Sequence, residues 1–171
     1  MVFEWGPGMA HVADPIVFEK MVFISNPTAG QGGVLLDISG GQPKVVWHNK
    51  DIINEIATRV LVDGCLFGSE GPTERLDALK CVEWKTGEII WEKEMKGISL
   101  ISANEKLITL DADGILRIAE ATSSAYKEIS SCDVFGPEIT MRQFYTPPVL
   151  CNGKIYCRNY PGDLICIDVS K

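Results

Sequence analysis

Apolar residues occur along the chain in short runs separated by turn-forming dipeptides. The runs are rich in Val, Ile, Leu and aromatic residues, as in "PIVFE", "VLLDI", "KLITL", "KIYC" and "LICID". The separators contain Gly in almost every case, as in Gly40-Gly41, Asp63-Gly64, Thr86-Gly87, Asp113-Gly114 and Asn152-Gly153. Runs of this length and composition between such turns predict β-strands joined by tight hairpins.

The same pattern argues against helices. No window carries an apolar stripe with a 3.6-residue period sustained over several turns, so helices are predicted to be minor or absent. Many runs are apolar at consecutive positions, which is typical of strands that are covered on both faces. The chain is therefore predicted to be all-β, with sheets stacked against sheets.

Three of the four tryptophans close apolar runs at a nearly constant interval. Trp5, Trp47 and Trp91 end the runs "VFEW", "KVVW" and "EIIW" and are 42 and 44 positions apart. The segments between them share a pattern of four strands, and the copies begin near Ala13, Ile56, Gly97 and Thr146. A four-stranded repeat of about 40 residues is the size of a β-propeller blade.

The repeat predicts a single β-propeller segment over residues 1–171, with about four four-stranded antiparallel blades. The predicted blades are approximately 13–53, 54–96, 97–136 and 137–171, and residues 2–5 are predicted to form an outer strand. The last blade reaches Lys171 before its fourth strand. Residues 2–5 either close a four-bladed ring beside 163–169 or belong to a blade upstream, and the spacing after Trp5 favours the second arrangement.

Two longer segments resemble a known repeat. The stretch "ALKCVEWKTGEIIWE" is similar to the blade consensus of the pyrroloquinoline-quinone-like (PQQ-like) repeat, in which a Thr-Gly turn follows an acidic residue and the next strand ends in Trp. The stretch "TPPVLCNGKIYCRNYPGDLICIDVSK" resembles the first three strands of another such blade. The resemblance covers nearly the whole chain, the third unit being the most divergent, and it points to outer-membrane-assembly-like and quinoprotein-like propellers.

The resemblance implies a bacterial protein and a role for the tryptophans. Trp47 and Trp91 are expected to dock between neighbouring blades, because an indole offers a large apolar face and an N–H that needs a partner. Thr86 and Gly87 are expected to form the hairpin that orients Trp91, with Gly87 at positive φ. The third unit, "YKEISS", lacks this Trp.

The resemblance also implies a ring with more than four blades. This chain would then be the C-terminal part of a larger propeller, and its open ends are expected to promote self-association. A periplasmic or other extracytoplasmic location is implied as well, although the N-terminal stretch "MVFEWGPGMAHVADP" does not have the pattern of a signal peptide.

Charge and cysteine content narrow the possible partners. Sixteen basic and 23 acidic residues give a net charge of −7 without a basic block, so neither nucleic acid nor an anionic membrane is an expected partner. No apolar segment is long enough to span a bilayer. The six cysteines show no CxxC spacing and are interpreted mostly as small core residues, while a disulfide between Cys157 and Cys166 stays open.

Several short motifs imitate catalytic or ligand-binding signatures. "KTG" and "SSAYK" match two β-lactamase signatures in reversed order, and "DADG" resembles a calcium loop whose Gly comes too early, so all are interpreted as turns and loops. "NPTAGQGG" lacks the Lys-Ser/Thr that holds a phosphate. His11 and His48 have no ligand partner at metal spacing, and a Ser-His-Asp arrangement stays open although no GxSxG elbow is present.

The family resemblance raises the question of PQQ itself. Quinoprotein dehydrogenases hold the cofactor at the ring centre beside calcium, in alcohol dehydrogenases against an adjacent Cys-Cys pair. This sequence has no such pair, and none of its residues matches the calcium ligands, so no cofactor, metal or catalytic residue is predicted. The favoured function is a non-catalytic scaffold or interaction module for a protein partner; the alternative is a fragment of a PQQ-dependent oxidoreductase whose cofactor residues lie elsewhere.

Overall fold

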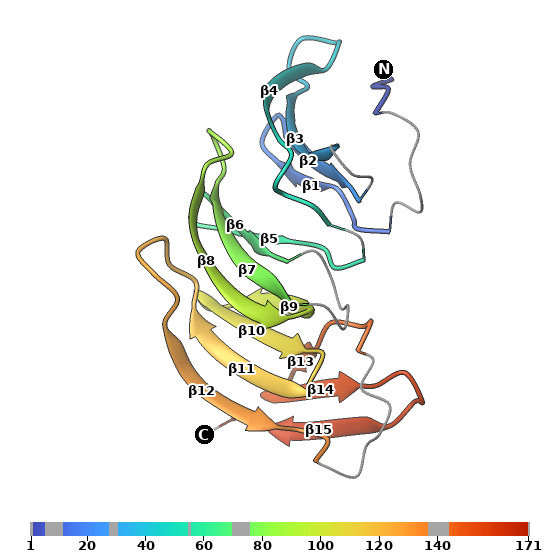
Figure 1. Cartoon of the computed structure of the whole chain (residues 1–171), viewed down its shortest axis with the longest axis vertical. Helices are drawn as coiled ribbons and strands as arrows, with labels where there is room; N and C mark the ends of the chain where they lie inside the picture. Colours follow the sequence, from blue (N-terminus) through green and yellow to red (C-terminus); the bar gives the residue numbers. More distant parts are fainter. Residues whose placement is uncertain are drawn as a thin grey trace.

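The computed structural model describes residues 2–5, 12–27, 31–54, 56–69, 76–136 and 144–170 of the chain. These residues form fifteen strands in four antiparallel sheets and contain no helix, so the all-β prediction is confirmed (Figure 1). In each sheet the strands are ordered as they occur in the chain. No helix long and apolar enough to cross a membrane occurs in this part of the chain.

The sheets follow one another along the chain. The first contains β1 (Ile16–Phe18), β2 (Met21–Asn26), β3 (Gly32–Asp37) and β4 (Lys44–Asn49). The second contains β5 (Val60–Val62), β6 (Cys65–Gly68), β7 (Leu76–Glu83) and β8 (Ile89–Lys96). The third contains β9 (Ile98–Ala103), β10 (Lys106–Asp111), β11 (Ile115–Glu120) and β12 (Glu128–Asp133). The fourth contains β13 (Val149–Cys151), β14 (Lys154–Arg158) and β15 (Leu164–Asp168).

The first hairpin of the later sheets is set by two consecutive residues at positive φ. Asp63 and Gly64 have φ of 45° and 75°, and Asn152 and Gly153 have φ of 50° and 69°. Asp-Gly and Asn-Gly favour this conformation, whose twist matches that of the flanking strands. The dipeptides singled out in the sequence therefore do form the tight turns.

A β-bulge recurs at one place in the first three sheets. The register between the third and fourth strands shifts after Leu35, after Cys81 and after Ile118. The residues directly opposite these three positions are Trp47, Trp91 and Ser130. Because directly opposite residues point to the same face of a sheet, these three positions are structurally equivalent.

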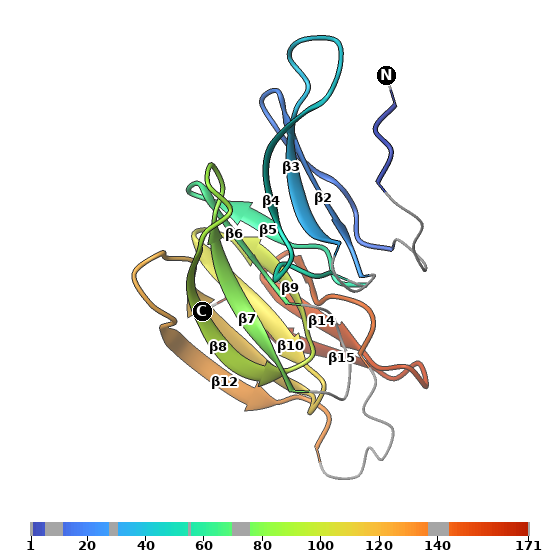
Figure 2. The same ribbon diagram turned by 45° about the horizontal axis from the view of Figure 1, so that its top comes forward.

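The core lies between the sheets. We call each sheet a blade and each interface between successive blades a seam. Phe23, Leu35 and Trp47 of the first blade pack against Leu66, Val82 and Trp84 of the second. Corresponding clusters fill the second seam, around Phe67 and Leu107, and the third, around Leu110 and Ile155. Figures 1 and 2 agree that the first blade lies at one end of this stack, with the N-terminal residues beside it.

Residues 2–5 do not form the outer strand that was predicted for them. The structure assigns them no strand and places them beside the first blade, far from β15 (Figure 1). The ring of Trp5 lies 5.3 Å from that of His48, and its carbonyl accepts a hydrogen bond of 3.4 Å from Asn26. Side-chain contacts thus hold this segment in place of strand pairing.

The disulfide that the sequence left open is not formed, and all six cysteines are free. Cys157 lies opposite Ile165, whereas Cys166 lies opposite Tyr156. Cys157 and Cys166 therefore point to opposite faces of the fourth blade, the first buried and the second exposed. Strand register, which the sequence spacing does not specify, separates the two thiols.

Candidate functional site

Trp47 lies in the first seam, against the turn between β7 and β8. Its indole N–H donates a hydrogen bond of 2.7 Å to the carbonyl of Trp84. Gly87 lies directly on the indole, since a Cβ built at this glycine would be 2.5 Å from Cδ2 of Trp47. The turn of the second blade therefore receives the tryptophan of the first, a relationship that the sequence interpretation did not include.

Thr86 and Gly87 belong to this turn. Gly87 has a φ of 73°, and its N–H donates to the carbonyl of Glu83 at 2.9 Å. The N–H of Thr86 donates to the Glu83 carboxylate at 2.6 Å, and its hydroxyl accepts from the N–H of Glu88 at 3.2 Å. These bonds fix the turn on which Trp47 packs and show that the "KTG" motif forms a hairpin turn.

Trp91 lies in the second seam and is half-buried. Its indole N–H donates a hydrogen bond of 2.9 Å to the carbonyl of Thr122 in the third blade. Its ring lies 5.8 Å from that of Phe67 and 6.1 Å from that of Tyr126. Both expected docking tryptophans thus contact the blade that follows them in the chain.

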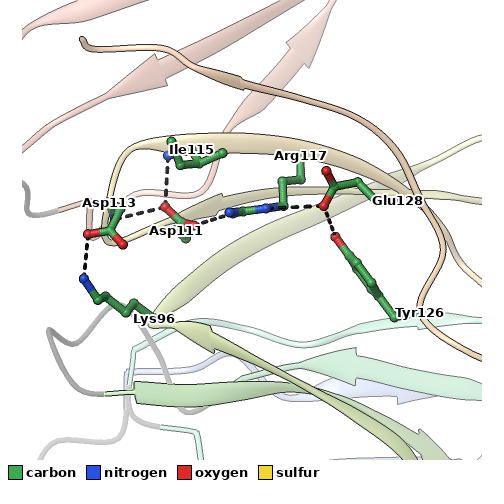
Figure 3. A network of polar contacts seen from close by, with 7 residues as sticks. All are labelled: Lys96, Asp111, Asp113, Ile115, Arg117, Tyr126 and Glu128. Carbon is green, nitrogen blue, oxygen red and sulfur yellow. Dashed lines mark hydrogen bonds and ion pairs between the residues drawn. The ribbon is translucent and has the colours of Figure 1, made fainter. Parts of the chain in front are cut away.

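The "DADG" segment forms the turn between β10 and β11. One oxygen of Asp111 accepts the N–H groups of Asp113 and Ile115, both at 2.9 Å, and the other pairs with Arg117 (Figure 3). Asp111 is buried and its carboxylate is occupied by these partners. The described residues contain no group of three His, Cys, Asp or Glu that could hold a metal ion.

This turn belongs to a longer polar network in the third blade. Arg117 also lies 3.4 Å from the carboxylate of Glu128, which accepts a hydrogen bond of 3.0 Å from the hydroxyl of Tyr126 (Figure 3). Burial, together with the hydrogen bond to Glu128, raises the pKa of Tyr126 well above its usual range. Lys96 at the end of β8 pairs with Asp113 at 3.0 Å, so the network also links the second blade to the third.

A cavity of about 230 Å³ lies where the four blades converge. Its wall is formed by residues at the start of each blade, among them Asp14, Thr58, Ser99 and Pro147. Asp14 and Thr58 are joined by two hydrogen bonds, of 3.0 and 3.4 Å. Tyr145 lines this cavity and also a neighbouring one of about 200 Å³.

Two tyrosines stand exposed at this end of the fourth blade. Tyr145 and Tyr160 are 40% and 60% exposed, with ring centroids 6.1 Å apart and nearly perpendicular planes. Arg158 and Thr146 line the same small cavity. Exposed Tyr and Arg side chains are enriched at protein interfaces, where they act as anchors.

The turn that carries Tyr160 is rigid. The side-chain oxygen of the buried Asn159 accepts the N–H groups of Gly162 and Asp163 at 3.1 and 2.8 Å, and its amide donates to the Asp163 carboxylate at 2.7 Å. The surface is therefore pre-organised, which lowers the entropic cost of binding. The sequence interpretation missed both tyrosines, and the available signal was an aromatic residue inside a Pro-containing turn, as in "YTPP" and "NYPGD".

Two buried thiols have raised pKa values. Burial raises the pKa of Cys157 to about 11. Burial, together with the neighbouring Cys65, also raises the pKa of Cys81. A raised pKa disfavours the reactive thiolate, so neither thiol has the character of a nucleophile.

Comparison with known proteins identifies the fold. No family model and no curated protein matches the sequence. The structure resembles that of BamB from Moraxella catarrhalis, with a TM-score of 0.66, 15% identity, and coverage of 90% of this chain and 42% of BamB. It also resembles the computationally designed Ika4 protein, with a TM-score of 0.61, 13% identity, and coverage of 99% of this chain and 100% of Ika4. A third similar structure is a europium-containing methanol dehydrogenase, with a TM-score of 0.58, 11% identity, and coverage of 80% of this chain and 27% of the dehydrogenase.

These likenesses show that the chain has a β-propeller fold, similar to the propellers of BamB and of the methanol dehydrogenase. The fold class and the resemblance predicted from the sequence are therefore confirmed. The chain spans less than half the length of BamB. Identities this low establish the fold alone, because one fold hosts many unrelated functions.

Proposed function

We propose that the chain is a non-catalytic propeller module that binds a protein partner through Tyr145 and Tyr160. The single observation that carries this proposal is the exposed tyrosine pair, presented by a turn that Asn159 holds rigid. An aromatic pair on a fixed turn offers a large contact area at a low cost in side-chain entropy on binding. The expected partner inserts an apolar side chain beside the rings and places an acidic group near Arg158, since guanidinium groups bind carboxylates well.

Site-specific photocrosslinking tests this proposal. A photoreactive phenylalanine derivative is placed at Tyr160 and, as a matched control, at Val45, an exposed apolar position of the first blade. We expect a product specific to position 160 that excess unlabelled wild-type protein suppresses. Excess Tyr145→Ser/Tyr160→Ser protein, with an unchanged melting temperature, should not suppress it. Equal suppression by both competitors, or the same products from both positions, would contradict the proposal.

Self-association is a second possible mode of binding. Apolar side chains are exposed at both ends of the stack of blades, Val17 on β1 and Leu164 on β15. Light scattering over a range of protein concentrations measures this directly. A molar mass that rises with concentration supports the mode, and a constant monomer mass rules it out.

The likeness to a methanol dehydrogenase supports the alternative of a quinoprotein fragment. The central cavity does not fit a calcium-bound quinone: of its described lining residues, Asp14 alone is a carboxylate, and Thr58 is hydrogen-bonded to it. Calcium takes six to eight oxygen ligands. Titration with PQQ and Ca²⁺, followed by quinone absorbance and dye-linked alcohol oxidation, distinguishes the two functions, because saturable binding with turnover would establish the oxidoreductase.

A further inference from the structure

The first seam is filled by four aromatic side chains. Phe23 and Trp47 lie opposite Leu35 on either side of β3, and their ring centroids are 5.7 Å apart. Phe18, the last residue of β1, lies edge-on to Trp84 of the second blade, with ring centroids 6.3 Å apart. Trp84 in turn is fixed by a backbone hydrogen bond of 2.9 Å from its N–H to the carbonyl of Gly64.

The third seam has smaller residues at all four positions. Ile108 and Ser130 lie opposite Ile118, as Phe23 and Trp47 lie opposite Leu35. Ala103 ends β9 as Phe18 ends β1, each paired with the first residue of the next strand. Val169 corresponds to Trp84, since its N–H donates to the carbonyl of Gly153 at 2.8 Å, in the equivalent hairpin.

A cavity of about 470 Å³ occupies the place of the missing rings. Ala103, Ile108 and Ile118 line it from the third blade, and Leu150, Ile155 and Val169 line it from the fourth. The lining is mainly apolar and also includes the polar residues Asn104, Lys106 and Asn152. Its volume lies within the range of about 300–1,000 Å³ that is typical of ligand pockets.

The cavity is accessible from solvent. Of its lining residues, Leu150 and Val169 are 37% and 38% exposed. Ser130, at the tryptophan position of the fourth strand and opposite the lining residue Ile118, is exposed as well. The first and second seams show what such a position accepts in this molecule. In each, a polypeptide inserts an indole between the blades, and a backbone carbonyl of the following blade accepts its N–H.

We propose that the third seam is a binding site for a tryptophan side chain of a partner protein. The indole takes the place that Trp47 and Trp91 occupy in the other two seams, between Ile118 and Val169. Burial of a flat aromatic ring in a preformed apolar cavity is favourable, as it is for aromatic ligands in engineered cavities. The site shares no described lining residue with the Tyr145 and Tyr160 surface, so it stands or falls independently of the proposed function.

The test uses N-acetyl-tryptophanamide, which carries the peptide groups of a chain, and free indole. Saturation-transfer NMR follows the ligand signals and is therefore unaffected by the protein's own tryptophans. We expect saturable binding of N-acetyl-tryptophanamide to the wild-type protein. If neither probe binds, the proposed site is wrong. If only free indole binds, the ligand is a small molecule and not a tryptophan side chain of a protein.

Substitutions that place a larger side chain of the protein itself in the cavity provide the variants for this test. Ser130→Trp should raise the melting temperature by about 2–4 °C and weaken probe binding at least about tenfold. Ser131→Trp, one residue further and on the opposite face of β12, should leave probe binding unchanged. Ala103→Phe fills the cavity from the other edge and is the second variant should Ser130→Trp not fold. Unaltered probe binding in a folded cavity-filling variant would overturn the proposal.

Discussion

The α-carbon of Gly87 lies against the indole ring of Trp47, which belongs to the preceding blade. The contact joins residues 40 positions apart and lies across the first seam. It requires both the positive φ of Gly87 and the absence of a side chain there. One glycine thus sets the turn of its own blade and the packing of its neighbour.

The substitution Gly87→Ala is expected to destabilise the protein by about 2–4 kcal/mol, through left-handed strain and overpacking together. Gly64→Ala is the matched control, because Gly64 has the same φ sign but no atom within 4 Å of the added Cβ. It should cost only the strain, about 1–2 kcal/mol. Urea unfolding measures both, and equal costs would show that the contact with Trp47 is unimportant.

The seam tryptophans should contribute strongly to stability. Trp47→Ala removes a buried indole and its hydrogen bond to Trp84, and we expect a loss of about 3–5 kcal/mol. The loss of stability in Trp91→Ala should lie near the lower end of that range, because Trp91 is half-buried. His48→Ala should cost less, about 0.5–1 kcal/mol, since this side chain is exposed and loses only its edge-on contact with Trp5 and its hydrogen bond with the Gln31 carbonyl. If chemical denaturation ranked the three variants equally, the docking role would be wrong.

The Asp111 network should stabilise the third blade. Asp111→Ala leaves Arg117 without its buried carboxylate and two backbone N–H groups without their acceptor, so about 3 kcal/mol should be lost. Glu120→Ala breaks the exposed pair with Lys127 in the same blade and should cost less than about 1 kcal/mol. Thermal unfolding of both variants provides the comparison, and a loss in Asp111→Ala no larger than the control would refute the role.

The buried thiol of Cys157 should make stability depend on pH in the alkaline range. Its pKa in the folded chain is about 11, above its ordinary value of 9.0, so the unfolded chain releases this proton first as the pH rises. The stabilising contribution of the protonated thiol is complete below about pH 9 and is lost as the pH rises toward about 11. Unfolding free energies of wild type and Cys157→Ala across this interval should converge with rising pH, and a constant difference would count against the shift.

The sequence by itself determined the strands, the turns and the repeat. Apolar runs and dipeptides such as Asp63-Gly64 act locally, because strand pattern and positive φ depend on a few adjacent residues. The interval between Trp47 and Trp91 then implied a blade-sized unit. The same local logic correctly assigned "DADG" and "KTG" to turns.

The tertiary structure decided which residues meet between blades. That Trp47 contacts Gly87 depends on the bulge in the first blade and on how two sheets stack, and neither follows from local pattern. Register also kept Cys157 apart from Cys166. Side-chain contacts such as that of Trp5 with His48, in place of the expected strand pairing, hold residues 2–5. The cavity beside Ile118 also depends on the tertiary structure. A missing ring leaves a cavity only where side chains of the neighbouring blade do not fill the space.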